Sequence, residues 1–280
     1  MTLLLSAAIV SICLPRDGGM IAWLERRLLY FPSHDVAHPT SAFGAGAEDV
    51  WFGANDRLHG VYVPGRQRPD IPNLTVLYFH GTGGNLSQRA PLIRQLLSEP
   101  GVNAFIIDYQ GYGKSRGQPS ERATADDARA AIAYLQRRPD VYTDRIVYFG
   151  ESLGGAVAIQ LAAEAPPLGL IVQSSFTSLA EMTRLHYPML SFLVPHATMR
   201  YDSLAAIRSV RAPLLLIHGE SDSLIPIHHS QALQEAAGGP TQLYVVPGAG
   251  HNDVVVQGRP ELWGAIRTFL TGLESSMAEP

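Results

Sequence analysis

The feature that most constrains the fold of this chain is a series of short, unbroken apolar runs separated by helix-like segments. Residues 76–79 and 214–217, for example, are apolar at every position. Runs of this kind are typical of strands that are buried on both faces of a parallel sheet. Because helix-like segments fall between the runs, the helices should cover both faces of a mostly parallel, doubly wound sheet. The chain is therefore predicted to be an α/β protein.

The predicted elements follow each other regularly from about residue 47 onward. The predicted strands are residues 48–53, 58–63, 74–80, 103–108, 145–150, 169–173, 213–218 and 242–246. The predicted helices are residues 86–98, 123–138, 152–164, 227–237 and 261–272. Only a short turn containing Asn55 and Asp56 separates the first two strands, which indicates a hairpin.

Length and composition favour one well-cored domain and exclude several classes of protein. The chain has 280 residues and a net charge of −4, and a nucleic-acid binder would need a basic face instead. Its single cysteine, Cys13, can form neither an intrachain disulfide nor a zinc–thiolate site. We expect a catalytic or binding domain at residues 34–280, preceded by a separate segment at residues 1–33, with no metal and no cofactor.

The N-terminal segment has two parts. Residues 3–14 are apolar, but a membrane-spanning helix needs about 20 apolar residues. Neither the positive charge nor the cleavage site of a secretory signal flanks the run, which disfavours secretion. Residues 20–31 resemble an amphipathic helix that could lie on a bilayer or, as we favour, dock on the domain. Localisation stays open between the cytoplasm and a membrane surface.

A longer insertion interrupts the strand–helix rhythm. About 40 residues separate the strands ending at residue 173 and beginning at residue 213, and they are apolar and broken by Pro188 and Pro195. We predict a small helical cap at about residues 175–208 that covers a substrate cleft, the alternative being extra core helices. Flexible and aromatic side chains suit the walls of such a cleft, so Met182, Met189 and Phe192 are the candidate substrate contacts.

Two serines occur in the pattern Gly-x-Ser-x-Gly. Ser152 follows a predicted strand directly and opens a helix, which is the strand–turn–helix arrangement that exposes a nucleophilic hydroxyl. Ser115 lies several residues beyond its strand and precedes a loop containing Pro119. The context therefore selects Ser152 as the candidate nucleophile.

A serine nucleophile needs a base and an acid that orients the base. Asp222 follows the strand at residues 213–218, and His251 follows the strand at residues 242–246. Both therefore lie at carboxyl ends of strands, in the order Ser, Asp, His. Glu220 and Asp253 are rival candidates for the acid.

Acyl transfer also needs hydrogen-bond donors for the developing oxyanion. The backbone N–H of Leu153, directly after the nucleophile, is one candidate. The other is the N–H of Thr82, in a glycine-rich loop after the strand at residues 74–80. The alternative for this loop is a plain strand-to-helix turn.

Taken together, these motifs resemble the α/β-hydrolase superfamily, and they are most similar to the BEM46-like serine hydrolases. The resemblance covers about residues 27–272 and rests on seven motifs: Arg27-Leu-Leu-Tyr-Phe-Pro32, Phe79-His-Gly-Thr-Gly-Gly-Asn85, Asp108-Tyr-Gln-Gly-Tyr-Gly-Lys-Ser115, the Ser152 elbow, Arg200-Tyr-Asp-Ser203, Gly219-Glu-Ser-Asp-Ser-Leu-Ile-Pro226 and Gly248-Ala-Gly-His251. It implies an eight-stranded sheet and hydrolysis of carboxylic esters or thioesters without a cofactor. Relatives include lipid-acting enzymes and protein depalmitoylases.

We therefore expect a serine carboxylesterase acting on a small-molecule ester, with an acyl preference at or below about eight carbons because a short cap can enclose only a small cleft. A membrane-associated acyl-thioesterase or lipid hydrolase, which would contact the membrane through the N-terminal segment, is the alternative. A peptidase is a third candidate, and a noncatalytic binding protein on the same fold is a fourth.

Overall fold

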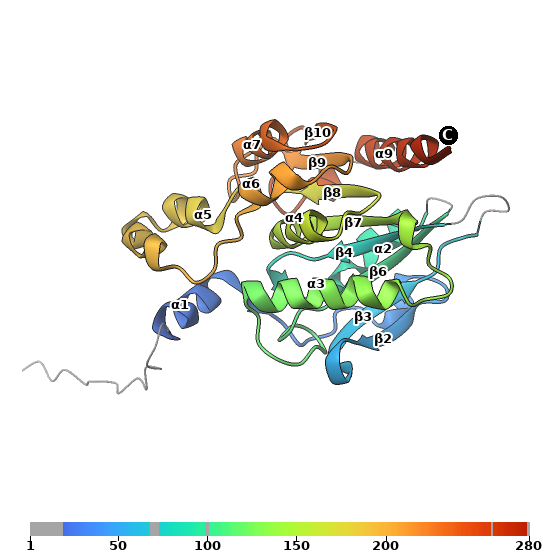
Figure 1. Ribbon diagram of the computed structural model, residues 1–280, viewed down its shortest axis with the longest axis horizontal. Helices are drawn as coiled ribbons and strands as arrows, with labels where there is room; N and C mark the ends of the chain where they lie inside the picture. The colour runs from blue at the N-terminus through green and yellow to red at the C-terminus, as the bar shows by residue number, and fades with distance from the viewer. Residues whose placement is uncertain (1–18, 68–72, 99–100, 259, 279–280) are drawn as a thin grey trace, which may run out of the picture.

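An eight-stranded sheet runs through the centre of the molecule (Figure 1), in the order β10-β9-β8-β7-β4-β6-β3-β2. The computed structural model describes residues 19–67, 73–98, 101–258 and 260–278. The strands of this sheet are β2 (Glu48–Phe52), β3 (Leu58–Val63), β4 (Leu74–Phe79), β6 (Val102–Ile107), β7 (Ile146–Glu151), β8 (Gly169–Gln173), β9 (Leu214–Gly219) and β10 (Thr241–Val246). Strands β2 and β3 form the predicted antiparallel hairpin. The neighbouring strands β6, β4, β7, β8, β9 and β10 pair in parallel. The predicted mostly parallel α/β fold is confirmed.

The helices include all those predicted and several short ones that the sequence pattern did not reveal. The α-helices are α1 (Gly19–Leu29), α2 (Ala90–Leu96), α3 (Glu121–Leu135), α4 (Leu153–Glu164), α5 (Leu179–His186), α6 (Ser203–Ala206), α7 (His228–Ala236), α8 (Val254–Gln257) and α9 (Glu261–Ala278). The 3-10 helices are η1 (Thr40–Phe43), η2 (Ala54–Asp56), η3 (Leu86–Arg89), η4 (Thr143–Arg145), η5 (Pro188–His196) and η6 (Ile207–Ser209).

Two hydrophobic cores lie on the two faces of the sheet. Alternate side chains of β4 divide between them, because successive residues of a strand point to opposite faces. Leu77 and Phe79 pack with side chains of α3 and α4, whereas Val76 and Tyr78 pack with side chains of α2 and α9. Burial on both faces explains why the strands are unbroken apolar runs.

The cap consists of α5 and η5. The Ser178 hydroxyl accepts a hydrogen bond from the amide of Glu181 and so begins α5, and Pro188 opens η5. Further along the chain, α6 and η6 pack against α4 and α7 rather than beside α5. The elements α5 and η5 lie within the predicted range of about 175–208, and the extent of the cap stays a prediction.

Helix α1 docks beside the cap at one end of the molecule (Figure 1). The Glu25 carboxylate accepts hydrogen bonds from the amides of Thr198 and Met199, at 2.9 and 3.3 Å. Arg26 donates to the carbonyl of Pro119 at 3.0 Å. Residues 1–18, including the apolar run, lie outside the described residues. Among the described helices, none combines the length and the apolar character that crossing a bilayer requires.

A two-residue sheet fixes the chain that follows α1. Strand β1 (Phe31–Pro32) pairs in parallel with β5 (Gly83–Gly84). This contact joins the N-terminal segment to the glycine-rich loop after β4. The sequence pattern did not predict it, since neither strand is long enough to show a period.

Candidate active site

Ser152 lies in a strained turn between β7 and α4. Its backbone angles are φ 54° and ψ −115°, which non-glycine residues rarely adopt. Two hydrogen bonds hold the turn: the Ser152 amide donates to the carbonyl of Gln173 at 2.8 Å, and the hydroxyl of Ser175 donates to the Ser152 carbonyl at 2.8 Å. The turn presents the hydroxyl at the carboxyl edge of the sheet, as the motif predicts.

The two glycines that flank this turn are required by the close approach of backbones. A Cβ atom at Gly150 would lie 2.2 Å from the carbonyl oxygen of Gly154. A Cβ atom at Gly154 would lie 2.0 Å from the carbonyl oxygen of Phe79. Because real contacts are much longer, any side chain at either position would push α4 away from the sheet and displace the serine between them.

His251 and Asp222 lie beside Ser152. Nε2 of His251 is 3.2 Å from Oγ of Ser152, and Nδ1 is 2.7 Å from Oδ2 of Asp222. A carboxylate can only accept, so the proton of the neutral imidazole lies on Nδ1 and the lone pair of Nε2 faces the serine hydroxyl. The arrangement can remove a proton from Ser152 while the hydroxyl attacks an electrophilic carbon.

The carboxylate of Asp222 is buried but well supplied with donors. Oδ1 accepts from the amides of Leu224 and Ile225, at 3.0 and 2.8 Å. Burial alone raises the pKa of Asp222, but hydrogen bonds from His218, His251 and the Ile225 amide outweigh it and hold the pKa well below its usual range. Asp222 therefore remains ionised and orients the imidazole of His251.

The structure separates Asp222 from its two rivals. Glu220 accepts from the amide of Gly248 at 3.0 Å, and Asp253 accepts from the amide of Gly250 at 2.7 Å. Both carboxylates thus stabilise the loop that carries His251, and it is Asp222 that contacts the ring. Ser115, the serine of the other motif, is buried and donates to the carbonyl of Asp108.

The two residues predicted to supply oxyanion donors, Thr82 and Leu153, line the cavity beside Ser152. Leu153 is the first residue of α4, and the first amides of a helix have no partner within it. The Thr82 carbonyl accepts from the Phe31 amide and the Tyr112 hydroxyl, and its side chain donates to the Leu29 carbonyl, which leaves its N–H for other use. Within the described parts of the chain, neither N–H has a protein acceptor.

A cavity of about 680 Å³ reaches Ser152, Leu153 and Thr82 from one side. Its walls are mostly apolar and come from three places: α1, the cap, and the loop after Asp222. A second cavity, of about 550 Å³, reaches His251 from the other side and is more polar, with Arg89 and Gln173 among its lining residues. Ser152 and His251 therefore lie where an apolar space and a polar space meet.

One of the three predicted wall residues lines the apolar cavity, and two do not. Met182, on α5, is in its wall. Met189 and Phe192 are 85% and 70% exposed and lie outside it, so their prediction as substrate contacts is corrected. In η5 it is Leu190, Leu193, Val194 and Pro195 that line the cavity. The sequence could not show which side of η5 faces the cavity, because nearly every residue of η5 is apolar.

Two further features of the site were not predicted from the sequence. Helix α1 supplies a wall of the cavity through Ile21, Leu24 and Leu28. Its amphipathic period signalled a buried face, but nothing in the sequence showed what that face covers. Glu151, the residue before the nucleophile, forms a bidentate ion pair with Arg89, at 3.0 and 3.2 Å, and no local motif marks that pair.

Comparison with known proteins gives the same fold and family. The sequence profile of the family described as serine aminopeptidase, S33, matches residues 70–208. The structure is similar to that of the esterase Pf2001 of Pyrococcus furiosus, with a TM-score of 0.69 and 21% identity over 86% of this chain and 97% of the esterase. At that identity the likeness concerns the fold.

Sequence relatives extend the comparison over most of the chain. The uncharacterized protein Rv2307c of Mycobacterium tuberculosis is 42% identical over 90% of this chain and 89% of its own length. The α/β-hydrolase domain-containing protein WAV2 of Arabidopsis thaliana is 31% identical, over 80% and 78%. Protein bem46 of Schizosaccharomyces pombe is 38% identical, over 54% and 52%. The fold, the serine elbow and these relatives agree: the chain belongs to the α/β-hydrolase superfamily of serine hydrolases and, within it, to the BEM46-like group.

Proposed function

We propose that this protein is a serine carboxylesterase that cleaves esters of short to medium acyl chains through an acyl-enzyme. The observation that carries the proposal is the hydrogen-bonded series Asp222–His251–Ser152, which meets the amides of Leu153 and Thr82 at the end of an apolar cavity. An esterase among the similar structures, Pf2001, adds support at the level of the fold.

In the proposed acylation step, Oγ of Ser152 attacks the ester carbonyl carbon while its proton passes to Nε2 of His251. The carbonyl oxygen becomes an oxyanion, to which the N–H groups of Leu153 and Thr82 donate. Asp222 stabilises the imidazolium. The bond to the alcohol then breaks, and the proton on Nε2 passes to the departing oxygen.

Deacylation repeats these movements with water as the nucleophile. Water transfers a proton to Nε2 of His251 and adds through its oxygen to the acyl carbon. The same two amides hold the second oxyanion. When the intermediate collapses, Oγ of Ser152 leaves and recovers the proton from Nε2, which releases the carboxylic acid and restores the enzyme.

The two cavities indicate how the substrate lies. The leaving oxygen must reach Nε2 of His251, so the alcohol extends toward the polar cavity that His251 lines. The acyl chain then occupies the apolar cavity, where contact with α1 and the cap removes its methylenes from water. A polar alcohol joined to an apolar acid is the ester that fits this arrangement.

The first prediction concerns chain length. Each methylene that becomes buried contributes about 0.8 kcal/mol, so kcat/KM should rise about fourfold per carbon until the cavity is full. We expect the maximum at or below about eight acyl carbons. The measurement is a series of p-nitrophenyl esters with two to about sixteen acyl carbons, accompanied by acyl thioesters and aminoacyl anilides. Faster hydrolysis of the anilides would instead identify a peptidase.

A second candidate function is hydrolysis of long acyl esters or thioesters at a phospholipid surface. The observation that favours it is an exposed group of large apolar side chains on the elements that wall the cavity: Met20 and Trp23 on α1, and Met189 and Phe192 on η5. We call this group the apolar rim. Exposed apolar patches of this kind mark interaction sites.

Two further observations point to lipid as what the rim contacts. Arg27 lies over the ring of Trp23, with 5.6 Å between Cζ and the ring centroid, and a tryptophan beside a cation is typical of helices that lie in a membrane interface. In the sequence, an apolar run at residues 3–14 also precedes α1. A phospholipid surface would therefore receive the rim, and an acyl chain could pass directly into the cavity.

The test of the rim is vesicle binding by the variant Met189→Ser/Phe192→Ser. We expect it to bind vesicles of phosphatidylcholine and phosphatidylserine at least tenfold less tightly, since it loses two large apolar side chains, each worth about 1.5–3 kcal/mol when buried. Hydrolysis of a short, soluble ester should not change.

The matched control is Tyr142→Ser, which removes an exposed aromatic side chain from the opposite end of the sheet, before β7. Equal binding by the double variant and this control would exclude the lipid-docking proposal. Self-association of the native chain that the double variant loses would assign the rim to a second copy instead.

A further inference from the structure

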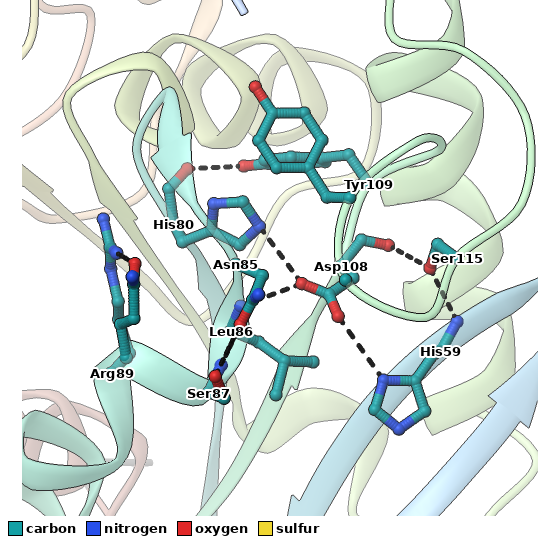
Figure 2. A network of polar contacts seen from close by, with 12 residues as sticks. His59, His80, Asn85, Leu86, Ser87, Arg89, Asp108, Tyr109 and Ser115 are labelled. Atoms are coloured by element: carbon teal, nitrogen blue, oxygen red, sulfur yellow. Dashed lines mark hydrogen bonds and ion pairs between the residues drawn. The ribbon is translucent and has the colours of Figure 1, made fainter. Parts of the chain in front are cut away.

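A series of alternating carboxylates and imidazoles lies beside the candidate active site. Asp49 contacts Nε2 of His59 at 2.6 Å, Nδ1 of His59 lies 3.5 Å from Asp108, and the other oxygen of Asp108 lies 3.6 Å from Nε2 of His80. Figure 2 shows His59, Asp108 and His80 in this order, each pointing toward the next. Each of these three residues is 2% exposed or less.

The presence of ionisable groups in the protein interior needs a physical explanation, because burying a charge is costly unless the charge is paired. Burial alone raises the pKa of Asp108, but hydrogen bonds from His59 and His80 and from the Leu86 amide lower it to about 2. Asp108 is therefore a carboxylate at neutral pH. None of these groups touches Ser152, His251 or Asp222, so the proposed reaction does not account for them.

This series of carboxylates and imidazoles ends at one specific peptide bond, the one between Gly81 and Thr82. Nδ1 of His80 lies 2.7 Å from the carbonyl oxygen of Gly81. That carbonyl and the N–H of Thr82 belong to the same peptide unit, and in a planar trans peptide the C=O and the N–H point in opposite directions. Whatever holds the carbonyl of Gly81 thus sets the direction of the N–H of Thr82.

No other group in the described parts of the chain holds this carbonyl. The remaining bonds of the loop act on the next peptide unit, through the carbonyl of Thr82, or on the Thr82 side chain. Gly81 itself is close to the nucleophile, since a Cβ atom there would lie 3.5 Å from Cβ of Ser152. The direction of this one N–H is therefore decided next to the reacting atoms.

We propose that His80 is a positioning residue for the oxyanion hole. Its Nδ1–H donates to the carbonyl of Gly81 and so aims the N–H of Thr82 at the oxyanion, while the carboxylate of Asp108 lies 3.6 Å from Nε2 on the other side of the ring. A hydrogen bond to a carbonyl also polarises the N–H of the same peptide, which strengthens it as a donor. This inference rests on the proposed esterase function, because the oxyanion hole has a role only in that reaction.

The expected effect follows from what one donor contributes. Removing a donor of an oxyanion hole lowers kcat by about 10²- to 10³-fold. Losing only the orientation of a donor that is still present should cost less, and we expect about 10- to 100-fold. KM should change little, because the ground-state carbonyl depends on these donors less than the oxyanion does.

Two substitutions test the two ring nitrogens of His80 separately, because each keeps the contact of one nitrogen and removes that of the other. The amide nitrogen of asparagine can take the place of Nδ1, so His80→Asn keeps the donor to Gly81. The amide of glutamine reaches the place of Nε2, so His80→Gln keeps the contact with Asp108 and loses the donor to Gly81. We expect His80→Gln to lose the 10- to 100-fold in kcat and His80→Asn to stay within about threefold of the native enzyme.

A second measurement distinguishes positioning from general stability. A trifluoromethyl ketone forms an oxyanion with Ser152, so its affinity should fall with kcat in His80→Gln and remain in His80→Asn. Tyr109→Phe is the matched control: it removes the hydroxyl that donates to the His80 carbonyl at 3.0 Å, in the same buried place, without touching the Gly81 carbonyl. Its kcat and inhibitor affinity should stay near native.

The outcomes separate this inference from the function on which it rests. A native protein that neither hydrolyses esters nor reacts with a fluorophosphonate would overturn the proposed function. An active native protein whose two His80 variants lose equal activity, or lose none, would overturn only the role of His80. If neither variant folds, nitrogen NMR of the native histidines decides, because a Nδ1 of His80 without a proton would also overturn that role.

Discussion

Replacing Ser152 with alanine is expected to lower kcat for ester hydrolysis by about 10⁶-fold. In the proposed reaction the serine hydroxyl forms the covalent bond to the acyl group, and alanine offers nothing that His251, 3.2 Å away, could activate. The turn itself should persist, because its hydrogen bonds involve the backbone of Ser152 and the side chain of Ser175. The measurements are p-nitrophenyl ester hydrolysis and labelling by a fluorophosphonate, both of which should disappear in a folded protein.

The matched control for this variant is Ser115→Ala, which alters the serine of the other Gly-x-Ser-x-Gly motif. The Ser115 hydroxyl donates to the carbonyl of Asp108 at 2.7 Å and accepts from the amide of His59 at 2.8 Å. We expect a loss of about 1–3 kcal/mol in the free energy of unfolding, because these buried groups lose a partner. Most of the activity per folded molecule should remain. An inactive Ser115→Ala beside an active Ser152→Ala would refute the choice of nucleophile.

The second large effect is expected for Asp222→Asn, which should lower kcat by about 10⁴-fold. An amide can present its N–H₂ group to Nδ1 of His251, and the ring would then carry its proton on Nε2, where it cannot accept the proton of Ser152. The charge that stabilises the imidazolium is also lost. Thermal unfolding should show a folded variant, since the side-chain oxygen can still accept from the amides of Leu224 and Ile225.

Glu220→Gln and Asp253→Asn are the matched controls for the acid. Each removes one negative charge from the same two loops, and each native carboxylate bonds a loop amide rather than the imidazole. Both variants should keep kcat within about tenfold of native, since they remove support for the His251 loop but leave its partner in place. A loss of 10⁴-fold in either one, with Asp222→Asn near native, would move the acid to that position.

Much of the fold was predictable because its signals are local. The strands β4 and β9 are buried on both faces, so they are apolar at nearly every residue, and the runs locate them within one residue. The serine elbow combines a strand, a tight turn and a helix in a few consecutive positions, and backbone sterics demand glycine at two of them. The loops that carry Asp222 and His251 follow directly from strands, and parallel strands bring their carboxyl ends to one edge.

Other parts of the site depend on contacts between distant segments. The sequence left three carboxylates as candidates for the acid, and the path of two loops decided among Glu220, Asp222 and Asp253. Met189 and Phe192 seemed suited to a cavity wall, yet η5 turns them outward, because an almost wholly apolar segment has no period that marks its buried face.

The sequence by itself thus determined the sheet, the candidate nucleophile and the order of the candidate catalytic side chains, since each of these is encoded in consecutive residues. Only the tertiary structure showed that α1 walls the cavity and that Asp49, His59, Asp108 and His80 form one series, buried at all but Asp49, which ends at Gly81. These four residues come from β2, β3 and the ends of β6 and β4. Their meeting depends on which strands are neighbours in the sheet, and no local pattern of residues shows that order.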